Sequence, residues 1–215
     1  MPQHNEMARF ISFEGGEGGG KSTQIARLAD WLRGHGQTVV ATREPGGSPG
    51  AEEIRALFVS GGADRWDGAT EALLVSAARR DHVRKTILPA LESGAWVLCD
   101  RFADSTLAYQ GYGRGQPLPM LRSLQEIATD GLLPSLTLWL DLPLEEGLRR
   151  AAQRRGGEAR FEGLDLGFHR RVAEGFAALA AAEPSRFRRI DADGTPEAVS
   201  ARIAAAICAH FPDLA

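Results

Sequence analysis

Short apolar runs alternate with longer segments of helical periodicity along the chain. The runs are rich in β-favouring residues, and five stand out: Phe10–Phe13, Thr38–Thr42, Trp96–Cys99, Leu136–Leu140 and Arg188–Asp191. Strands that alternate with helices are typical of a parallel sheet covered on both faces. The pattern therefore predicts an α/β protein with three layers, α/β/α, around a five-stranded parallel sheet.

The segment after the first run has the pattern of an amphipathic helix. Ile25, Leu28, Ala29 and Leu32 recur at i, i+3, i+4 and i+7, and the pattern ends near Gly34. A short glycine-rich segment is all that separates this helix from the first predicted strand.

Two stretches interrupt the alternation. Ala103–Gly131 contains several glycines in a polar segment before an apolar helix at Met120–Ile127, and we interpret it as a functional loop followed by that helix. Arg149–Glu162 is dense in arginine and glycine after the fourth run and its helix. We interpret it as a mobile basic lid.

The composition favours one domain that binds small molecules. A chain of 215 residues that is 43% hydrophobic can bury a single core, so we expect one domain over residues 1–215, with a loose polar tail at 1–8. The 25 basic residues against 28 acidic ones provide no positive field for a nucleic-acid backbone.

The cysteines and the apolar stretches indicate the cellular compartment of the protein. Cys99 and Cys208 are the only cysteines, and they form no CxxC pattern, so neither a disulfide framework nor a zinc site is indicated. No stretch has the length of a membrane span, and the start of the chain lacks the apolar core of a secretory signal. We expect a cytoplasmic protein without membrane association.

The glycine-rich segment between the first strand and helix matches the phosphate-binding pattern GxxxxGK[ST]. Backbone N–H groups of such a loop surround phosphates, aided by the positive end of the helix dipole. Lys21 would reach the β and γ phosphates, and the Ser22 hydroxyl would bind Mg²⁺. A glycine turn with a chance lysine is the alternative, expected in roughly one in a hundred chains or fewer. The predicted nucleotide-binding residues are Gly15, Gly16, Glu17, Gly18, Gly19, Gly20, Lys21, Ser22 and Thr23.

The scarcity of asparagine narrows the class of nucleotide-binding protein. Asn5 is the only asparagine, so the Asn-Lys-x-Asp element with which GTPases read guanine is absent. No LSGGQ-type signature of transport ATPases occurs either. Among switches, motors and kinases, this favours a kinase.

Charged residues follow three of the predicted elements. Asp100 ends the third strand, where a second Mg²⁺ ligand is expected, and a surface ion pair with Arg101 is the alternative. The second strand ends in Thr42–Gly47, which is either a ligand site at the sheet edge or a helix-entry turn. The lid arginines suit a transferring phosphoryl group, although a solvated helix face would account for some of them. They are Arg149, Arg150, Arg154, Arg155 and Arg160.

Together these motifs resemble the thymidylate kinase family from Phe10 to about Ile207. The segments that carry the resemblance are Phe13–Ser22, Thr42–Gly47, Ala77–Arg79, Asp100–Phe102, Tyr109–Gly115 and Leu138–Leu142. The resemblance implies a P-loop NTPase-type fold with a lid, and transfer of the γ-phosphoryl group of ATP, bound with Mg²⁺, to dTMP. It also implies a homodimer formed through packed helices, with Leu73–Leu91 as a candidate region.

The resemblance also implies roles for individual residues. Glu17 would lie near the acceptor sugar, Arg101 would meet the acceptor phosphate, and Arg79 the base. Pro45 would pack against the thymine methyl group, and Tyr109 below the sugar would disfavour a ribose 2'-hydroxyl. The other expected acceptor-site residues are Arg43, Val75, Phe102, Thr106 and Gln110.

The transition-state arginine is expected from the lid. Some family members carry an arginine inside the P-loop, but the loop positions here are Gly16, Glu17, Gly18 and Gly19. The expected catalytic residues are Lys21, Arg101, Glu17, Arg154, Arg155 and Arg160.

One position departs from the family pattern. Val75 stands where members usually have a phenylalanine that stacks on thymine, a contact worth roughly 0.5–1.5 kcal/mol between aromatic rings. Phe102 or another aromatic residue could supply the missing ring. A deoxynucleoside kinase with Glu17 as base stays an alternative. So does a nucleotide-dependent binding module whose lid is a partner surface.

Overall fold

The computed structural model describes residues 9–62, 64–153 and 164–214. Its centre is a five-stranded sheet in which every neighbouring pair is parallel, in the order β2-β3-β1-β4-β5. The strands are β1 (Phe10–Glu14), β2 (Val39–Arg43), β3 (Trp96–Asp100), β4 (Leu136–Asp141) and β5 (Phe187–Asp191). The prediction of a five-stranded parallel sheet is confirmed, with boundaries shifted by one residue at most strand ends.

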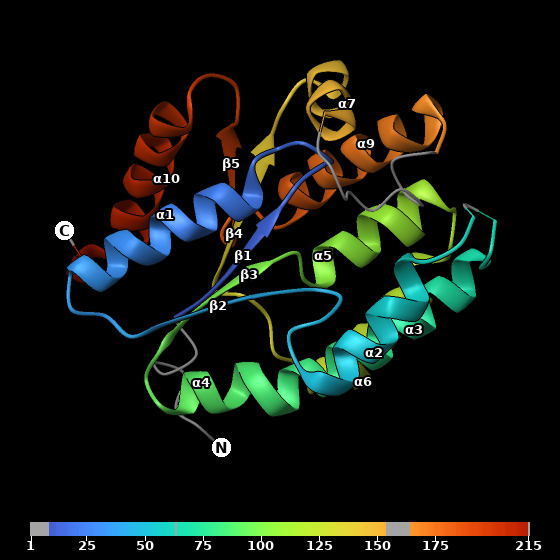
Figure 1. The fold of residues 1–215 in the computed structure, drawn as a ribbon, viewed down its shortest axis with the longest axis horizontal. Helices are drawn as coiled ribbons and strands as arrows, with labels where there is room; N and C mark the ends of the chain where they lie inside the picture. The colour runs from blue at the N-terminus through green and yellow to red at the C-terminus, as the bar shows by residue number, and fades with distance from the viewer. Residues whose placement is uncertain (1–8, 63, 154–163, 215) are drawn as a thin grey trace.

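Helices cover both faces of this sheet (Figure 1). Helices α1 (Lys21–Gly34) and α10 (Pro196–His210) pack on one face. The others described are α2 (Pro49–Val59), α3 (Gly68–His82), η2 (Val83–Ile87), α4 (Leu88–Glu92), α5 (Ala103–Thr106), η3 (Leu107–Gly113), α6 (Leu118–Thr129), α7 (Leu144–Ala152), α9 (Leu166–Ala182) and η4 (Pro212–Leu214). This arrangement confirms the three-layer α/β/α fold. No helix among the described residues combines the length and apolar character needed to cross a bilayer.

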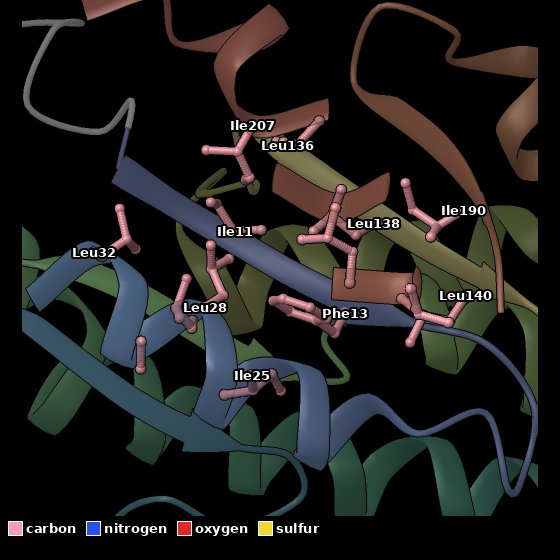
Figure 2. Packing of buried hydrophobic residues seen from close by; sticks show 14 of the residues in the cluster. Ile11, Phe13, Ile25, Leu28, Leu32, Leu136, Leu138, Leu140, Ile190 and Ile207 are labelled. Carbon is pink, nitrogen blue, oxygen red and sulfur yellow. The ribbon is translucent and has the colours of Figure 1, made fainter. Parts of the chain in front are cut away.

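The two faces of the sheet bury alternate residues of each strand, as the two-residue period of a strand requires. Ile11 and Phe13 of β1 pack with α1 and α10, where Figure 2 shows them against Leu28 and Leu138. Phe10 points to the opposite face and packs with η2, α4 and β3. The predicted buried stripe of α1 is confirmed, because its four apolar positions are all buried.

The predicted helix at Met120–Ile127 is confirmed within α6, but most of the segment predicted as a functional loop before it is helical, so that part of the prediction was wrong. Ala103–Thr106 continues directly into the π-helix Leu107–Gly113. Its glycines serve packing: a Cβ at Gly111 would lie 2.6 Å from Leu118 Cδ2, and one at Gly113 would lie 2.6 Å from Phe168 Cε2. Gly111 and Gly113 therefore allow neighbouring helices to approach closely, whereas Gly115, with φ 75°, lies in the short loop before α6.

The first two arginines of the predicted lid lie on a helix. Arg149 and Arg150 lie on α7, where Glu146 accepts from Arg149 Nε at 2.7 Å and from Arg150 Nε at 2.5 Å. Helical spacing of i, i+3 and i+4 brings these three side chains together. Arg154, Arg155 and Arg160 lie outside the described residues.

Candidate active site

The phosphate-binding loop joins β1 to α1 at the carboxyl edge of the sheet. Lys21 is the first residue of α1, and its Nζ donates to the carbonyl oxygens of Gly15 (3.3 Å) and Gly16 (2.9 Å). Burial and the neighbouring Arg101 lower the pKa of Lys21. A phosphate bound in the loop would supply the negative charge that this buried ammonium favours.

Ser22 and Asp100, the two predicted metal ligands, contact each other directly. The strands β1 and β3 are neighbours with Phe13 opposite Asp100, and Ser22 Oγ donates to Asp100 Oδ2 at 2.7 Å. A hydroxyl and a carboxylate are the hard oxygen ligands that Mg²⁺ prefers. The described residues contain no cluster of three His, Cys, Asp or Glu side chains that could hold a metal alone. The pair therefore fits an Mg²⁺ ion that takes its other ligands from phosphate and water.

A pocket opens beside the P-loop residue Glu17. It gathers side chains from the loop, from the end of β2, and from α2, α3, α5 and η3. They are Glu17, Glu44, Pro45, Phe58, Val75, Arg79, Arg101, Phe102, Ser105, Thr106, Tyr109 and Gln110. Of the ten residues expected near the acceptor, all except Arg43 are in this set, so residues far apart in sequence meet in one pocket.

Arg101 is fixed between the P-loop and the pocket. Its backbone is left-handed (φ 66°), and its N–H donates to Phe13 O at 2.9 Å. Its Nη2 donates to Glu17 Oε1 at 2.8 Å, and its guanidinium carbon lies 4.8 Å from the centre of the Tyr109 ring. The Tyr109 hydroxyl donates to the same Glu17 oxygen at 2.8 Å. These contacts hold the guanidinium at the entrance to the pocket.

The same contacts decide the charge of Glu17. Burial would raise its pKa, but the charges of Arg101 and Lys21 and the Tyr109 hydroxyl outweigh burial and lower the pKa to about 2. Burial raises the pKa of Tyr109 well above its ordinary value of 10. At neutral pH the pocket therefore holds an ionised Glu17 beside a neutral phenol.

A buried carboxyl supports the turn that carries Arg101. Glu14 ends β1, and its Oε1 accepts from the Phe102 N–H at 2.8 Å while Ser105 Oγ donates to Oε2 at 2.5 Å. Burial, together with the negative charge of Asp104, raises the pKa of Glu14 to about 8. At neutral pH the Glu14 carboxyl group is therefore mostly protonated.

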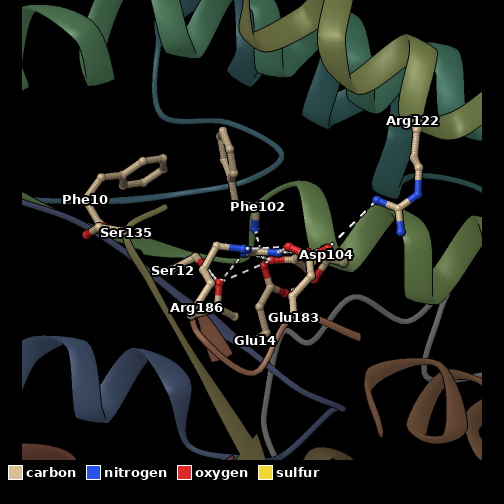
Figure 3. Close-up of polar contacts among 11 residues, drawn as sticks. Phe10, Ser12, Glu14, Phe102, Asp104, Arg122, Ser135, Glu183 and Arg186 are labelled. Atoms are coloured by element: carbon tan, nitrogen blue, oxygen red, sulfur yellow. Dashed lines mark hydrogen bonds and ion pairs between the residues drawn. The ribbon is translucent and has the colours of Figure 1, made fainter. Parts of the chain in front are cut away.

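The charge of Asp104 is balanced by the partly buried Arg186, as Figure 3 shows. Arg186 donates to the two Asp104 oxygens at 2.7 Å and 2.9 Å, and to Thr137 Oγ1 at 2.6 Å. The Asp104 side chain is 2% exposed. The network ties β4 and the segment before β5 to the helix that follows Arg101.

Arg79 lies in a second buried network at the back of the pocket. Its Nε donates to Glu44 Oε2 at 2.7 Å, and its Nη2 donates to Thr106 Oγ1 at 3.1 Å. His82 Nδ1 lies 3.0 Å from Glu44 Oε1, and its Nε2 lies 2.7 Å from Thr42 Oγ1. His82 therefore packs in this network and helps to position Glu44.

Some predicted residues lie elsewhere. Arg43 is exposed, does not line the pocket, and pairs with both Glu52 oxygens at 3.1 Å. Thr23 is exposed on α1 behind the P-loop. The candidate transition-state arginines are not among the described residues.

Phe58 lines the pocket, although sequence reasoning missed it. It lies on α2 and packs in the same buried cluster as Val75 and Tyr109. Phe102, the compensating aromatic suggested by sequence, already packs edge-on against Phe10 with ring centres 4.9 Å apart. The only signal for Phe58 was an aromatic residue within a helical segment, which does not distinguish a pocket from a core.

The P-loop also touches the helix before the lid. A Cβ at Gly18 would lie 2.1 Å from the carbonyl oxygen of Gly147, and a Cβ at Gly147 would lie 2.6 Å from the carbonyl oxygen of Glu17. The two backbones therefore pack against each other without side chains between them.

Comparison with known proteins agrees with this geometry. The sequence profile of the thymidylate kinase family matches residues 13–203. The thymidylate kinase of Caulobacter vibrioides is 58% identical over 194 residues, which cover 90% of this chain and 93% of the relative. That of Rhizorhabdus wittichii is 51% identical over 205 residues, covering 95% of this chain and 99% of the relative.

A solved structure gives the same result. The crystal structure of thymidylate kinase from Ehrlichia chaffeensis superposes with a TM-score of 0.77 at 32% sequence identity, covering 92% of this chain and 97% of that one. Both the profile and the curated relatives extend over most of the chain and include the P-loop and the pocket. The chain therefore belongs to the thymidylate kinase family.

Proposed function

We propose that this protein transfers the γ-phosphoryl group of ATP to dTMP, giving ADP and dTDP. The observation that carries the proposal is the pocket beside Glu17, where the side chains that the family pattern assigns to the acceptor converge. Arg101 joins this pocket to the P-loop through Glu17 and the carbonyl oxygen of Gly15. An acceptor phosphate at Arg101 would therefore lie near a donor phosphate held by the loop.

ATP would bind with its phosphates in the P-loop. Lys21 would neutralise the β and γ phosphates, and Ser22 with Asp100 would hold Mg²⁺. The bound ion would offset negative charge on the transferring group. Catalysis by this chain would then consist of positioning and charge neutralisation by Lys21, Arg101 and lid arginines, with no covalent enzyme intermediate. Arg154, Arg155 and Arg160 stay candidates for the transition-state arginine.

The acceptor would lie along the pocket, from Arg101 at its phosphate to Arg79 at its base. Tyr109 and Glu17 would flank the sugar, and Pro45 would face the thymine methyl group. Val75 would give the base apolar contact, and Phe58 is the additional aromatic side chain in reach of the pocket.

Glu17 argues against a deoxynucleoside kinase. Such an enzyme needs a carboxylate that accepts the proton of a sugar hydroxyl. Glu17 accepts from Arg101 and Tyr109 on one oxygen and has a pKa of about 2, so it is a weak base. A phosphate acceptor needs no such base, because it is already ionised at neutral pH.

A homodimer is part of the proposal. Leu57 on α2, Leu73 on α3 and Ile127 on α6 are 49%, 57% and 70% exposed. The helix pairs α2–α3 and α3–α6 are in contact, so these side chains belong to neighbouring helices.

A cytoplasmic location also stays proposed, and it suits the unpaired thiols of Cys99 and Cys208.

The test is a coupled assay of ADP formation with Mg-ATP and a panel of acceptors: dTMP, dUMP, UMP, dCMP and thymidine. The expected result is a strong preference for dTMP. If thymidine or another base is preferred, the acceptor assignment fails while the kinase chemistry stands. If no acceptor stimulates turnover, the protein is a nucleotide-binding module.

A further inference from the structure

Glu71 is a fully buried carboxylate on α3 that does not line the pocket. Arg114 Nη2 donates to its Oε1 at 2.8 Å, and Gln110 Nε2 donates to its Oε2 at 3.0 Å. Arg114 thus places a positive charge beside this buried side chain. Glu71 thus contacts the pocket through Gln110.

This contact fixes the orientation of the Gln110 side-chain amide. The Glu71 oxygens accept from a guanidinium and from an amide NH₂ group, whereas the amide of Gln110 has both an NH₂ donor and a carbonyl acceptor. The NH₂ group of Gln110 must therefore face Glu71. The carbonyl oxygen lies on the other branch of the amide and is left for a ligand, since Gln110 lines the pocket.

Arg79 supplies the complementary donor. Glu44 and Thr106 accept from its Nε and Nη2. Its Nη1 is buried and has no hydrogen-bond partner within the described part of the chain. A buried guanidinium N–H is costly without an acceptor, so a carbonyl oxygen of a bound base would satisfy it.

A donor beside an acceptor matches one edge of the pyrimidines. Thymine and uracil present a carbonyl oxygen next to a ring N–H, whereas cytosine presents an amino group next to an unprotonated ring nitrogen. The amino group of cytosine would therefore face the Arg79 N–H, two donors together, and its ring nitrogen would face the Gln110 carbonyl oxygen, two acceptors together. We propose that Glu71 is a positioning residue for base selectivity, which holds the Gln110 carbonyl toward the base and so disfavours cytosine. This inference rests on the proposed function.

Glu71→Gln tests the proposal. The introduced amide can keep its carbonyl toward Arg114 and turn its NH₂ group to Gln110, whose own amide must then flip. The ratio of kcat/KM for dTMP to that for dCMP should fall about 10- to 100-fold, the range expected for one mismatched buried hydrogen-bonding group. The dTMP to dUMP ratio should not change, because these bases share the same edge. Glu53→Gln, the same substitution at an exposed position on α2, is the control and should leave both ratios unchanged.

Two results would overturn the inference: unchanged selectivity, or an equal fall in both ratios, which indicates general loosening. If Glu71→Gln does not fold, Gln110→Leu provides the test. It should lower kcat/KM for dTMP more than for dCMP, and the opposite order would mean that Gln110 presents its NH₂ group to the base. If the unmodified protein fails to phosphorylate dTMP, the proposed function fails. If it succeeds but selectivity does not respond to these substitutions, only the role of Glu71 fails.

Discussion

Glu14→Gln should remove a pH dependence of stability that originates at the buried end of β1. The pKa of Glu14 is about 8 in the folded protein, against an ordinary value of 4.5. Between these values the folded state keeps a proton that the unfolded state has released. The stability contributed by this group is therefore complete below about pH 4.5 and is lost as the pH rises toward 8.

The magnitude follows from the two pKa values. At about 1.4 kcal/mol per pH unit, the difference between about 8 and 4.5 corresponds to about 5 kcal/mol, of which about 3–4 kcal/mol falls between pH 5 and 8. The amide of Glu14→Gln can still accept from the Phe102 N–H and donate to Ser105 without titrating. Relative to the unmodified protein, the unfolding free energy of the variant should rise by about 3–4 kcal/mol as the pH increases from 5 to 8.

Urea unfolding at pH 5, 6, 7 and 8 measures this difference. Glu17 and Glu146, whose pKa values are lowered to about 2, titrate below this range, and their contributions cancel between the two proteins. Glu53→Gln serves as the exposed control. A difference in unfolding free energy between Glu14→Gln and the unmodified protein that stays constant from pH 5 to 8 would refute the reasoning.

Three further outcomes are expected. Lys21→Ala should lower kcat by at least about 100-fold in the ADP-formation assay, because it removes a preorganised charge at the phosphates, and near-normal turnover would contradict the assignment. Tyr109→Phe removes the hydroxyl that donates to Glu17, so the pKa of Glu17 should rise from about 2 toward 4.5. The fall in activity at acid pH should then begin at a higher pH than in the unmodified protein. If that fall begins at the same pH, Tyr109 does not influence the ionisation of Glu17. Gly113→Ala should cost about 1–3 kcal/mol in thermal or urea unfolding because of the contact with Phe168, whereas Gly34→Ala, whose Cβ meets nothing within 4 Å, should cost nothing.

The features with a local pattern were predictable from the sequence. The strands, the buried stripe of α1 and the P-loop each depend on spacing within a short segment. The helical structure around Gly111 and Gly113 was not predictable, because a glycine required for close packing gives the same sequence signal as a glycine in a turn. Only the partner residues Leu118 and Phe168 distinguish the two.

Some residues of the pocket and its surroundings were likewise predictable from the sequence, and others were not. Pro45, Arg79 and Gln110 were found because they lie in motif segments, and they do line the pocket. Phe58 and the buried carboxylates Glu14 and Glu71 were missed, since their importance depends on which side chains the fold brings to them. Arg43 lies at the predicted sheet edge but is turned to Glu52, a choice between partners that sequence position does not decide.

The backbone contact between Gly18 and Gly147 limits how the enzyme can be recombined with its relatives. A side chain at either position would meet main-chain atoms, which cannot move aside as a flexible side chain can. A chimera that takes its phosphate loop from one parent and α7 from another would therefore combine surfaces that were shaped separately. Exchange of the two segments as one block would preserve the spacing between the P-loop backbone and α7.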